Sequence, residues 1–132
     1  MRQPETTIQN AIQDYIKDNG GDVFKVHGSS MQRAGEPDLC GEIPILGEWV
    51  HFKIEVKTPT GVPSALQKVR LRRYHMRGYL VGVVTSVADT SRLIEAYTLF
   101  KANNGLVTWE AVLKLCEIED TYHIYTQEAQ HD

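Results

Sequence analysis

The chain has 132 residues, of which 42% are hydrophobic and 23% charged, and its formal net charge is −3. This length favours a single domain with one core, and this composition is ordinary for a globular protein. No apolar run approaches the roughly 20 residues that cross a bilayer, and residues 1–5 are too polar for a secretory signal, so we expect a cytoplasmic protein without membrane contact.

The N-terminal part predicts a helix followed by a short strand. Apolar residues recur at helical spacing over residues 5–17, with Pro4 at the start and two glycines as the stop. Glu5 lies in the first turn, where its simplest role is to favour the helix dipole. Residues 22–27 are consistent with a first strand, and residues 28–35 read as a polar loop.

Two antiparallel strands joined by a tight turn are predicted next. Apolar and polar residues alternate over residues 50–57, which indicates a strand with one buried face. If the chain reverses at Leu46 and Gly47, opposed residue numbers sum to 93, so Asp38 lies directly across from Glu55. The same register gathers an apolar set on the other face, namely Leu39, Ile43, Ile45, Val50, Phe52, Ile54 and Val56. A register shifted by one residue would expose this apolar set, so the hydrophobic pattern argues against such a shift.

Asp38, Glu55 and Lys57 are therefore predicted to share one face of the strand pair. Two carboxylates suit a hard divalent cation such as Mg²⁺, which is often held by one or two carboxylates plus water and phosphate oxygens. Lys57 lies roughly 7 Å along the strand from Glu55, where its ammonium can reach a phosphate or an attacking water. The simpler interpretation is an exposed Glu/Lys face on an ordinary hairpin, but such a face has no need of an acid at Asp38.

The second half of the chain predicts further helices and strands. Ser64 is a good N-cap for a helix that runs through Arg77. The continuous apolar run at residues 79–84 is typical of a strand covered on both faces, and we expect it inside the sheet beside the Glu55 strand. Three segments then follow, namely a helix over residues 88–101, a shorter helix capped by Thr108 and an edge strand over residues 122–125.

Charge is distributed unevenly along the chain. Half of all Lys and Arg lie within residues 53–77, a stretch that contains a single acid, Glu55. Residues 106–132 instead carry one Lys against six acids. The basic stretch suits a phosphate backbone, although a charged helix face is more often simply solvated. Because like charges repel, we expect the acidic tail to pack away from a nucleic acid, against the sheet or a second subunit.

The chain resembles the PD-(D/E)xK nucleases, and most closely their virus-type replication-repair (VRR-NUC) branch, at Gly35-Glu36-Pro37-Asp38, Glu55-Val56-Lys57, Gly61 and Gln67. The resemblance covers about residues 5 to 90. It implies an α/β, restriction-endonuclease-like fold with a core of order α-β-β-β-α-β, a mixed sheet flanked by helices, and an α-rich C-terminal extension. We expect one domain over residues 1–132, with the core at about residues 5–100 and the acidic extension at about residues 106–132.

The resemblance also implies roles for individual residues. Asp38, Glu55 and the main-chain carbonyl of Val56 would hold Mg²⁺, or Mn²⁺ in its place. Lys57 would orient the attacking water or help to deprotonate it, Gln67 would point at the same site, and Glu5 would approach it from the first helix. Six basic residues are candidates for contacts with DNA phosphates, namely Arg33, Lys53, Lys68, Arg70, Arg73 and Arg77.

These features predict a metal-dependent DNA endonuclease. Small phage-type proteins that resemble this chain act on branched DNA, including four-way (Holliday) junctions that arise in recombination and repair, usually as homodimers. The resemblance thus implies branched DNA and a second copy of the chain as partners, in the cytoplasm of a bacterium or a phage-infected host. Two alternatives stay open, namely a nuclease-fold protein that binds nucleic acid without cutting it and an interaction module whose acidic tail recruits a basic partner.

Overall fold

The computed structural model describes residues 4–26 and 34–126, so the predicted phosphate contact at Arg33 lies outside the described residues. The elements are α1 (Glu5–Asp18), β1 (Asp22–Lys25), β2 (Leu39–Ile45), β3 (Glu48–Val56), α2 (Ala65–Met76), β4 (Leu80–Val84), α3 (Val87–Ala102), α4 (Trp109–Leu115) and α5 (Glu119–Thr126). The predicted core order of α-β-β-β-α-β is confirmed. Within the described ranges, no helix combines the length and apolar character needed to cross a membrane.

The four strands form one mixed sheet in the order β1-β2-β3-β4, in which the first three are antiparallel and β4 runs parallel to β3. The predicted register is confirmed, because the β2–β3 pairs run from Ile45 opposite Glu48 to Leu39 opposite Ile54. The reversal uses Leu46 and Gly47, both with positive φ (52° and 79°), as expected for a two-residue hairpin turn that matches the strand twist. The turn and the alternating pattern therefore specify the same pairing.

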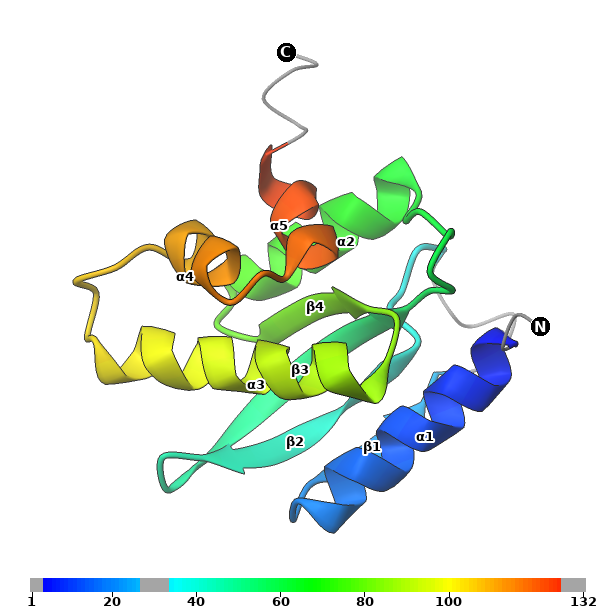
Figure 1. Cartoon of the computed structure of the whole chain (residues 1–132), viewed down its shortest axis with the longest axis horizontal. Helices are drawn as coiled ribbons and strands as arrows, with labels where there is room; N and C mark the ends of the chain where they lie inside the picture. Colours follow the sequence, from blue (N-terminus) through cyan, green and yellow to red (C-terminus); the bar gives the residue numbers. More distant parts are fainter. Residues whose placement is uncertain (1–3, 27–33, 127–132) are drawn as a thin grey trace.

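The prediction that β4 lies inside the sheet is wrong, although its place beside β3 is confirmed. β4 is the last strand in the order, yet all five of its residues are buried. Helices cover both of its faces, with α3 on one side and α2 and α5 on the other (Figure 1). The contact with α3 is close at Gly82, where an added Cβ would lie 2.3 Å from Leu93 Cδ2. A buried apolar run therefore reports coverage on both faces, not a central position.

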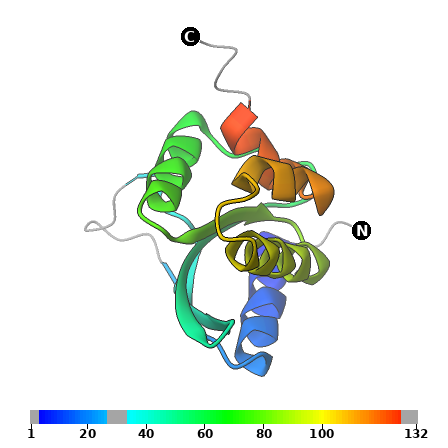
Figure 2. The same ribbon diagram turned by 90° about the vertical axis from the view of Figure 1, so that its left-hand side faces the viewer.

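Helices divide between the two faces of the sheet (Figure 2). The larger core joins α1, α3 and α4 to one face, and its members include Ile12, Leu39, Phe52, Leu93 and Leu113. The smaller core lies between α2, α5 and the other face of β4, and consists of Leu71, Tyr74, Val81, Val83 and Ile124. Because β3 alternates, Glu55 and Lys57 lie on the side of α2, whereas Ile54 and Val56 enter the larger core.

Two predicted helix caps are confirmed. Ser64 Oγ accepts the main-chain N–H of Gln67 at 3.1 Å, and Ser64 N–H donates to Gln67 Oε1 at 2.8 Å, which completes a capping box at the start of α2. Thr108 Oγ1 accepts the N–H of Ala111 at 3.1 Å at the start of α4. Both caps follow from local sequence, so they could be predicted without knowledge of the tertiary fold.

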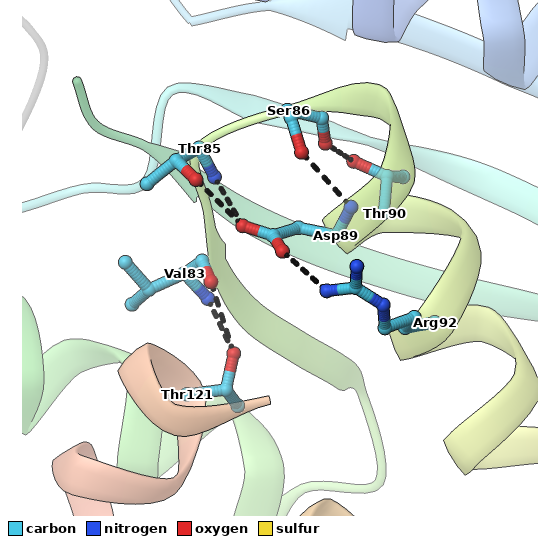
Figure 3. A network of polar contacts seen from close by, with 7 residues as sticks. All are labelled: Val83, Thr85, Ser86, Asp89, Thr90, Arg92 and Thr121. Atoms are coloured by element: carbon cyan, nitrogen blue, oxygen red, sulfur yellow. Dashed lines mark hydrogen bonds and ion pairs between the residues drawn. The ribbon is translucent and has the colours of Figure 1, made fainter. Parts of the chain in front are cut away.

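The edge strand predicted over residues 122–125 is wrong, because these residues belong to α5. The α-rich extension instead packs its helices on the rest of the domain. Thr121 is fully buried, and its hydroxyl donates to the carbonyl of Val83 in β4 at 3.1 Å and accepts the Val83 N–H at 2.9 Å (Figure 3). Two features favour a helix here. Acids lie in its first turn, where they interact well with the helix dipole, and Thr121 and Ile124 are three residues apart and both buried, as on one face of a helix. These features outweigh the preference of the aromatic residues in this segment for a strand.

Candidate active site

The carboxyl end of β3 holds a buried carboxylate, Glu55, whose side chain lies next to that of Asp38 on the same face of the sheet. The register that ends at Leu39 opposite Ile54 brings these two acids side by side. Asp38 is anchored through both its main chain and its side chain. Its carbonyl accepts the Val26 N–H at 2.7 Å, and its Oδ2 accepts the Val56 N–H at 2.9 Å. The two predicted acids are thus held together by main-chain bonds from both neighbouring strands.

Lys57 and Gln67 converge on one oxygen of Glu55. Lys57 Nζ lies 3.0 Å from Glu55 Oε2, and Gln67 Nε2 donates to the same oxygen at 2.7 Å. Gln67 reaches it because the capping box fixes its other amide atom at the first turn of α2. The residues that the motif predicted from three separate elements are therefore brought together: Asp38 precedes β2, Glu55 and Lys57 lie at the end of β3, and Gln67 lies on α2.

The second oxygen of Glu55 has no partner. Glu55 is 1% exposed, and its Oε1 is buried without a hydrogen bond. Burial is the main cause that raises the pKa of Glu55 to about 7, and the charge of Asp38 adds to it. Lys57 opposes the rise, as does, more weakly, the main-chain N–H of Asp38, which lies near the carboxylate but outside the geometry of a hydrogen bond to Oε1. A buried acceptor without a donor is costly, so this oxygen fits a cation as its missing partner.

The donor set around this oxygen suits a hard divalent ion. It comprises the carboxylates of Asp38 and Glu55, which are oxygen donors, and the Val56 main chain adjoins them through its N–H bond to Asp38. Among residues 4–26 and 34–126 no three His, Cys, Asp or Glu side chains cluster as metal ligands. A site with two carboxylates therefore fits Mg²⁺, which completes its shell with water and phosphate oxygens, better than an ion that needs an all-protein cage.

A glutamine on α1, Gln9, was missed by the sequence reasoning. It is 8% exposed. Burial raises the pKa of Asp38, whereas the Val56 N–H, Lys57, Lys25 and, least of all, the Gln9 side chain lower it. Glu5, the residue predicted to approach the site from this helix, lies one turn earlier and is half-buried. The available signal was the position of Gln9 between two buried isoleucines of the helix, Ile8 and Ile12, which places it on the core side.

The loop that precedes Asp38 is held by α2. Arg70 Nε donates to the carbonyl of Ala34 at 3.1 Å and lies 3.5 Å from Glu36 Oε2, and Tyr74 Oη donates to the other Glu36 oxygen. Gly35 has φ of 81°, and an added Cβ would lie 2.7 Å from Leu66 Cγ. Glycine is therefore needed at this turn, and the Gly-Glu-Pro-Asp motif is docked as a unit on the helix that also supplies Gln67.

The predicted phosphate-binding residues are spread along α2 and β3. Lys53 Nζ lies 4.7 Å from the centre of the Tyr74 ring and 5.8 Å from that of Tyr79, and the Arg77 guanidinium lies 5.8 Å from the Tyr74 ring. Arg73 and Arg77 are exposed, whereas Lys68 and Arg70 are half-buried. The basic charge thus lines α2 and the neighbouring strand face instead of forming one cluster at Glu55.

A mixed sheet of this topology, with an acid before β2 and an acid and a lysine two residues apart at the end of β3, defines a PD-(D/E)xK-like α/β nuclease fold. One solved structure, a "VRR_NUC domain", is 33% identical in sequence and aligns over 70% of this chain and 96% of its own, with a TM-score of 0.58. The chain belongs to the VRR-NUC family of nuclease domains, which generally use divalent metal ions.

A second solved structure, a "VRR_NUC domain protein", is 19% identical, aligns over 74% of this chain and 89% of its own, and has a TM-score of 0.56, which supports the fold alone. No protein-family model and no curated protein sequence matches the chain.

Proposed function

We propose that this protein is a Mg²⁺-dependent DNA endonuclease that hydrolyses phosphodiester bonds, with Mn²⁺ as a possible substitute ion. The observation that carries the proposal is the buried, unpartnered Oε1 of Glu55, which lies on a carboxylate already bound by Lys57 and Gln67 and next to Asp38. A purely structural glutamate has no reason to leave one buried oxygen without a partner.

We propose that Asp38, Glu55 and the Val56 carbonyl hold the ion. When bound, a divalent ion lowers the pKa of water and neutralises charge on a phosphate. Lys57, fixed by its 3.0 Å contact with Glu55, presents an ammonium that orients the attacking water or stabilises the charge that develops on the phosphate. Gln67 holds the Glu55 carboxylate in place at 2.7 Å, and Gln9 lies near Asp38 and lowers the pKa of that carboxyl slightly. Glu5 stays a secondary candidate on the same helix as Gln9.

The basic residues of α2 and β3 would bind the phosphate backbone without reading sequence. Arg73 and Arg77 are the exposed members, and the half-buried Lys53 of β3 and Lys68 of α2 add further charge. Arg70 is held by Ala34 and Glu36, so a phosphate contact would use its remaining guanidinium nitrogens. Contacts of this kind would give affinity for DNA in general.

Branched DNA is the substrate class that we propose, with four-way junctions as the leading example. Symmetric cutting of a junction needs two active sites, and each chain has one, so a homodimer would be the simplest active form. This part of the proposal rests on the family resemblance, and the metal site does not depend on it.

The test incubates labelled four-way junction, flap and linear duplex with the protein in Mg²⁺ or in EDTA. We expect cleavage in Mg²⁺ only, preference for the branched substrates, and a loss of roughly a thousandfold in Asp38→Asn, which keeps the shape of the carboxylate but not its charge. Asp14→Asn, an exposed position on α1, is the matched control and should cleave normally.

Two outcomes would overturn the proposal. Tight binding of DNA without any product in Mg²⁺ or Mn²⁺ would indicate a nuclease-fold binding protein. Neither binding nor product would indicate a protein-interaction module.

A further inference from the structure

Among residues 4–26 and 34–126, no helix covers part of the sheet face next to the candidate active site. On the side that carries Glu55, helices α2 and α5 pack over β4 and leave β1 and β2 without a helix among the described residues (Figure 2). Phe24 of β1 is 57% exposed there, and His51 of β3 is exposed as well. These side chains border a hollow of about 230 Å³ whose floor includes Cys40 and Lys53. An exposed phenylalanine in a hollow is unusual enough to ask what covers it.

By the strand register, this hollow lies one row of side chains away from the active site. Phe24 pairs with Cys40, and Cys40 pairs with Lys53, so the three form one row across β1, β2 and β3. The next row on the same face, toward the start of β2 and the end of β3, consists of Asp38 and Glu55. Side chains two residues apart on a strand are separated by roughly 7 Å. A group bound over the first row would therefore lie beside a phosphate held at Glu55.

The chemistry of the row suits a nucleotide. Phe24 offers a flat apolar ring, and every nucleobase can stack on such a ring whatever its identity. Lys53 offers a positive charge that is held in place over the Tyr74 ring at 4.7 Å. On the side of the Phe24 row that faces away from Glu55, the next row carries Glu42. Its carboxylate lies 3.9 Å from His51 Nδ1 and repels phosphate. The favourable surface is therefore one row deep.

We propose that Phe24, Cys40 and Lys53 form a subsite for one unpaired nucleotide next to the cleaved phosphate, with the base stacked on Phe24 and its phosphate near Lys53. The proposal rests on the proposed nuclease function and deepens it, because it makes an unpaired base at the branch the feature that the protein recognises. The hollow, of about 230 Å³, is too small to enclose a whole nucleotide, so it would receive the base while the sugar and phosphate lie at its rim.

A second copy of the chain is the other occupant to consider. A stable protein interface typically buries about 1,600 Å² and keeps charges out of its centre. This hollow is small and is lined by the charged residues Lys53 and Glu42, and the row of Asp38 and Glu55 lies next to it, so a nucleotide is the favoured occupant.

The test measures binding in EDTA, so that it does not depend on cleavage. The probes are a fully paired duplex and the same duplex with a short unpaired overhang that contains the fluorescent base 2-aminopurine. We expect the intact protein to quench the 2-aminopurine, and Phe24→Ser to weaken binding of the overhang about tenfold while the fully paired duplex loses less than threefold. Leu115→Ser, at a position that is 76% exposed on the C-terminal extension, is the control and should change neither affinity.

An equal change for both probes in Phe24→Ser, or no change in either, would overturn the inference. So would a dimer of the intact protein that becomes a monomer in Phe24→Ser by sedimentation, because the face would then be an interface between copies. The two proposals fail separately. Mg²⁺-dependent cleavage without a selective effect of Phe24→Ser removes only the subsite, and a selective effect without cleavage removes only the nuclease.

Discussion

The carboxylates of Glu55 and Asp89 lie near the carboxyl ends of the parallel strands β3 and β4, and they are satisfied in different ways. Asp89 Oδ2 accepts the N–H of Thr85 at 2.9 Å and its hydroxyl at 2.7 Å, and Oδ1 lies 3.1 Å from Arg92 Nη1 (Figure 3). Glu55 instead receives two donors on one oxygen and none on the other.

The difference separates a structural acid from one arranged for chemistry. All the partners of Asp89 come from within four residues of it, at the turn from β4 into α3, so this acid closes a local structure. The partners of Glu55 come from β3 and α2 and leave a buried oxygen open, which stabilises the fold less than a complete set would. An incomplete buried set is therefore a better sign of a binding site than the mere presence of an acid.

The burial of the Glu55 carboxylate should make the stability of the folded chain depend on pH, and this is the largest of the stability effects that we expect. Because the pKa of Glu55 is raised from 4.5 to about 7, the folded chain keeps a proton that the unfolded chain has already lost. The free energy of unfolding of the metal-free protein should therefore fall as the pH rises from about 4.5 through 7, by roughly 3 kcal/mol in total. The raised pKa of Asp38 acts in the same direction.

Urea unfolding in EDTA at pH 5 and pH 8 measures this dependence. Glu55→Gln cannot ionise and should flatten most of the slope, whereas Asp14→Asn should keep it. A slope that is as steep in Glu55→Gln as in the unaltered protein would contradict the assignment.

Asp89 should behave in the opposite way. Asp89→Asn removes the ion pair with Arg92 and one of the acceptors at the start of α3, so we expect the free energy of unfolding to fall by roughly 1–2 kcal/mol. Cleavage by the folded variant should stay within about twofold of the unaltered protein, because Asp89 has no contact with Asp38, Glu55, Lys57 or Gln67 among the described interactions. Thermal unfolding and initial cleavage rates at a temperature below the transition measure both properties. A folded Asp89→Asn that no longer cleaves would place this acid in the active site.

The acids of the C-terminal extension should have the smallest effect. Glu110 lies on α4, Glu117 lies between α4 and α5, and Glu119 begins α5. Exchange of these three acids for Gln should alter the cleavage rate by less than about twofold at moderate salt. Rates measured over a range of salt concentrations provide the check. If the Gln variants cleave much faster than the unaltered protein at low salt, these acids repel DNA from the site.

Much of the fold could be predicted because its signals are local. The alternation over β3, the turn at Leu46 and Gly47, and the caps at Ser64 and Thr108 each depend on residues close in sequence, and the structure confirms them. The errors concern context. β4 has the composition of a central strand but lies at the edge under helices, and α5 has aromatic residues that favour a strand until Thr121 and Ile124 are buried on one helical face.

Local sequence is enough to specify which residues share a strand face, because the period of two and the length of the turn leave one register that buries the apolar set. Asp38, Glu55 and Lys57 come together for that reason. How these groups are solvated depends instead on the packing of distant elements: Gln67 of α2 bonds Glu55, α1 brings Gln9 near Asp38, and one carboxylate oxygen is left without a donor. Burial depends on elements that are distant along the chain, and no local pattern encodes which of them will meet.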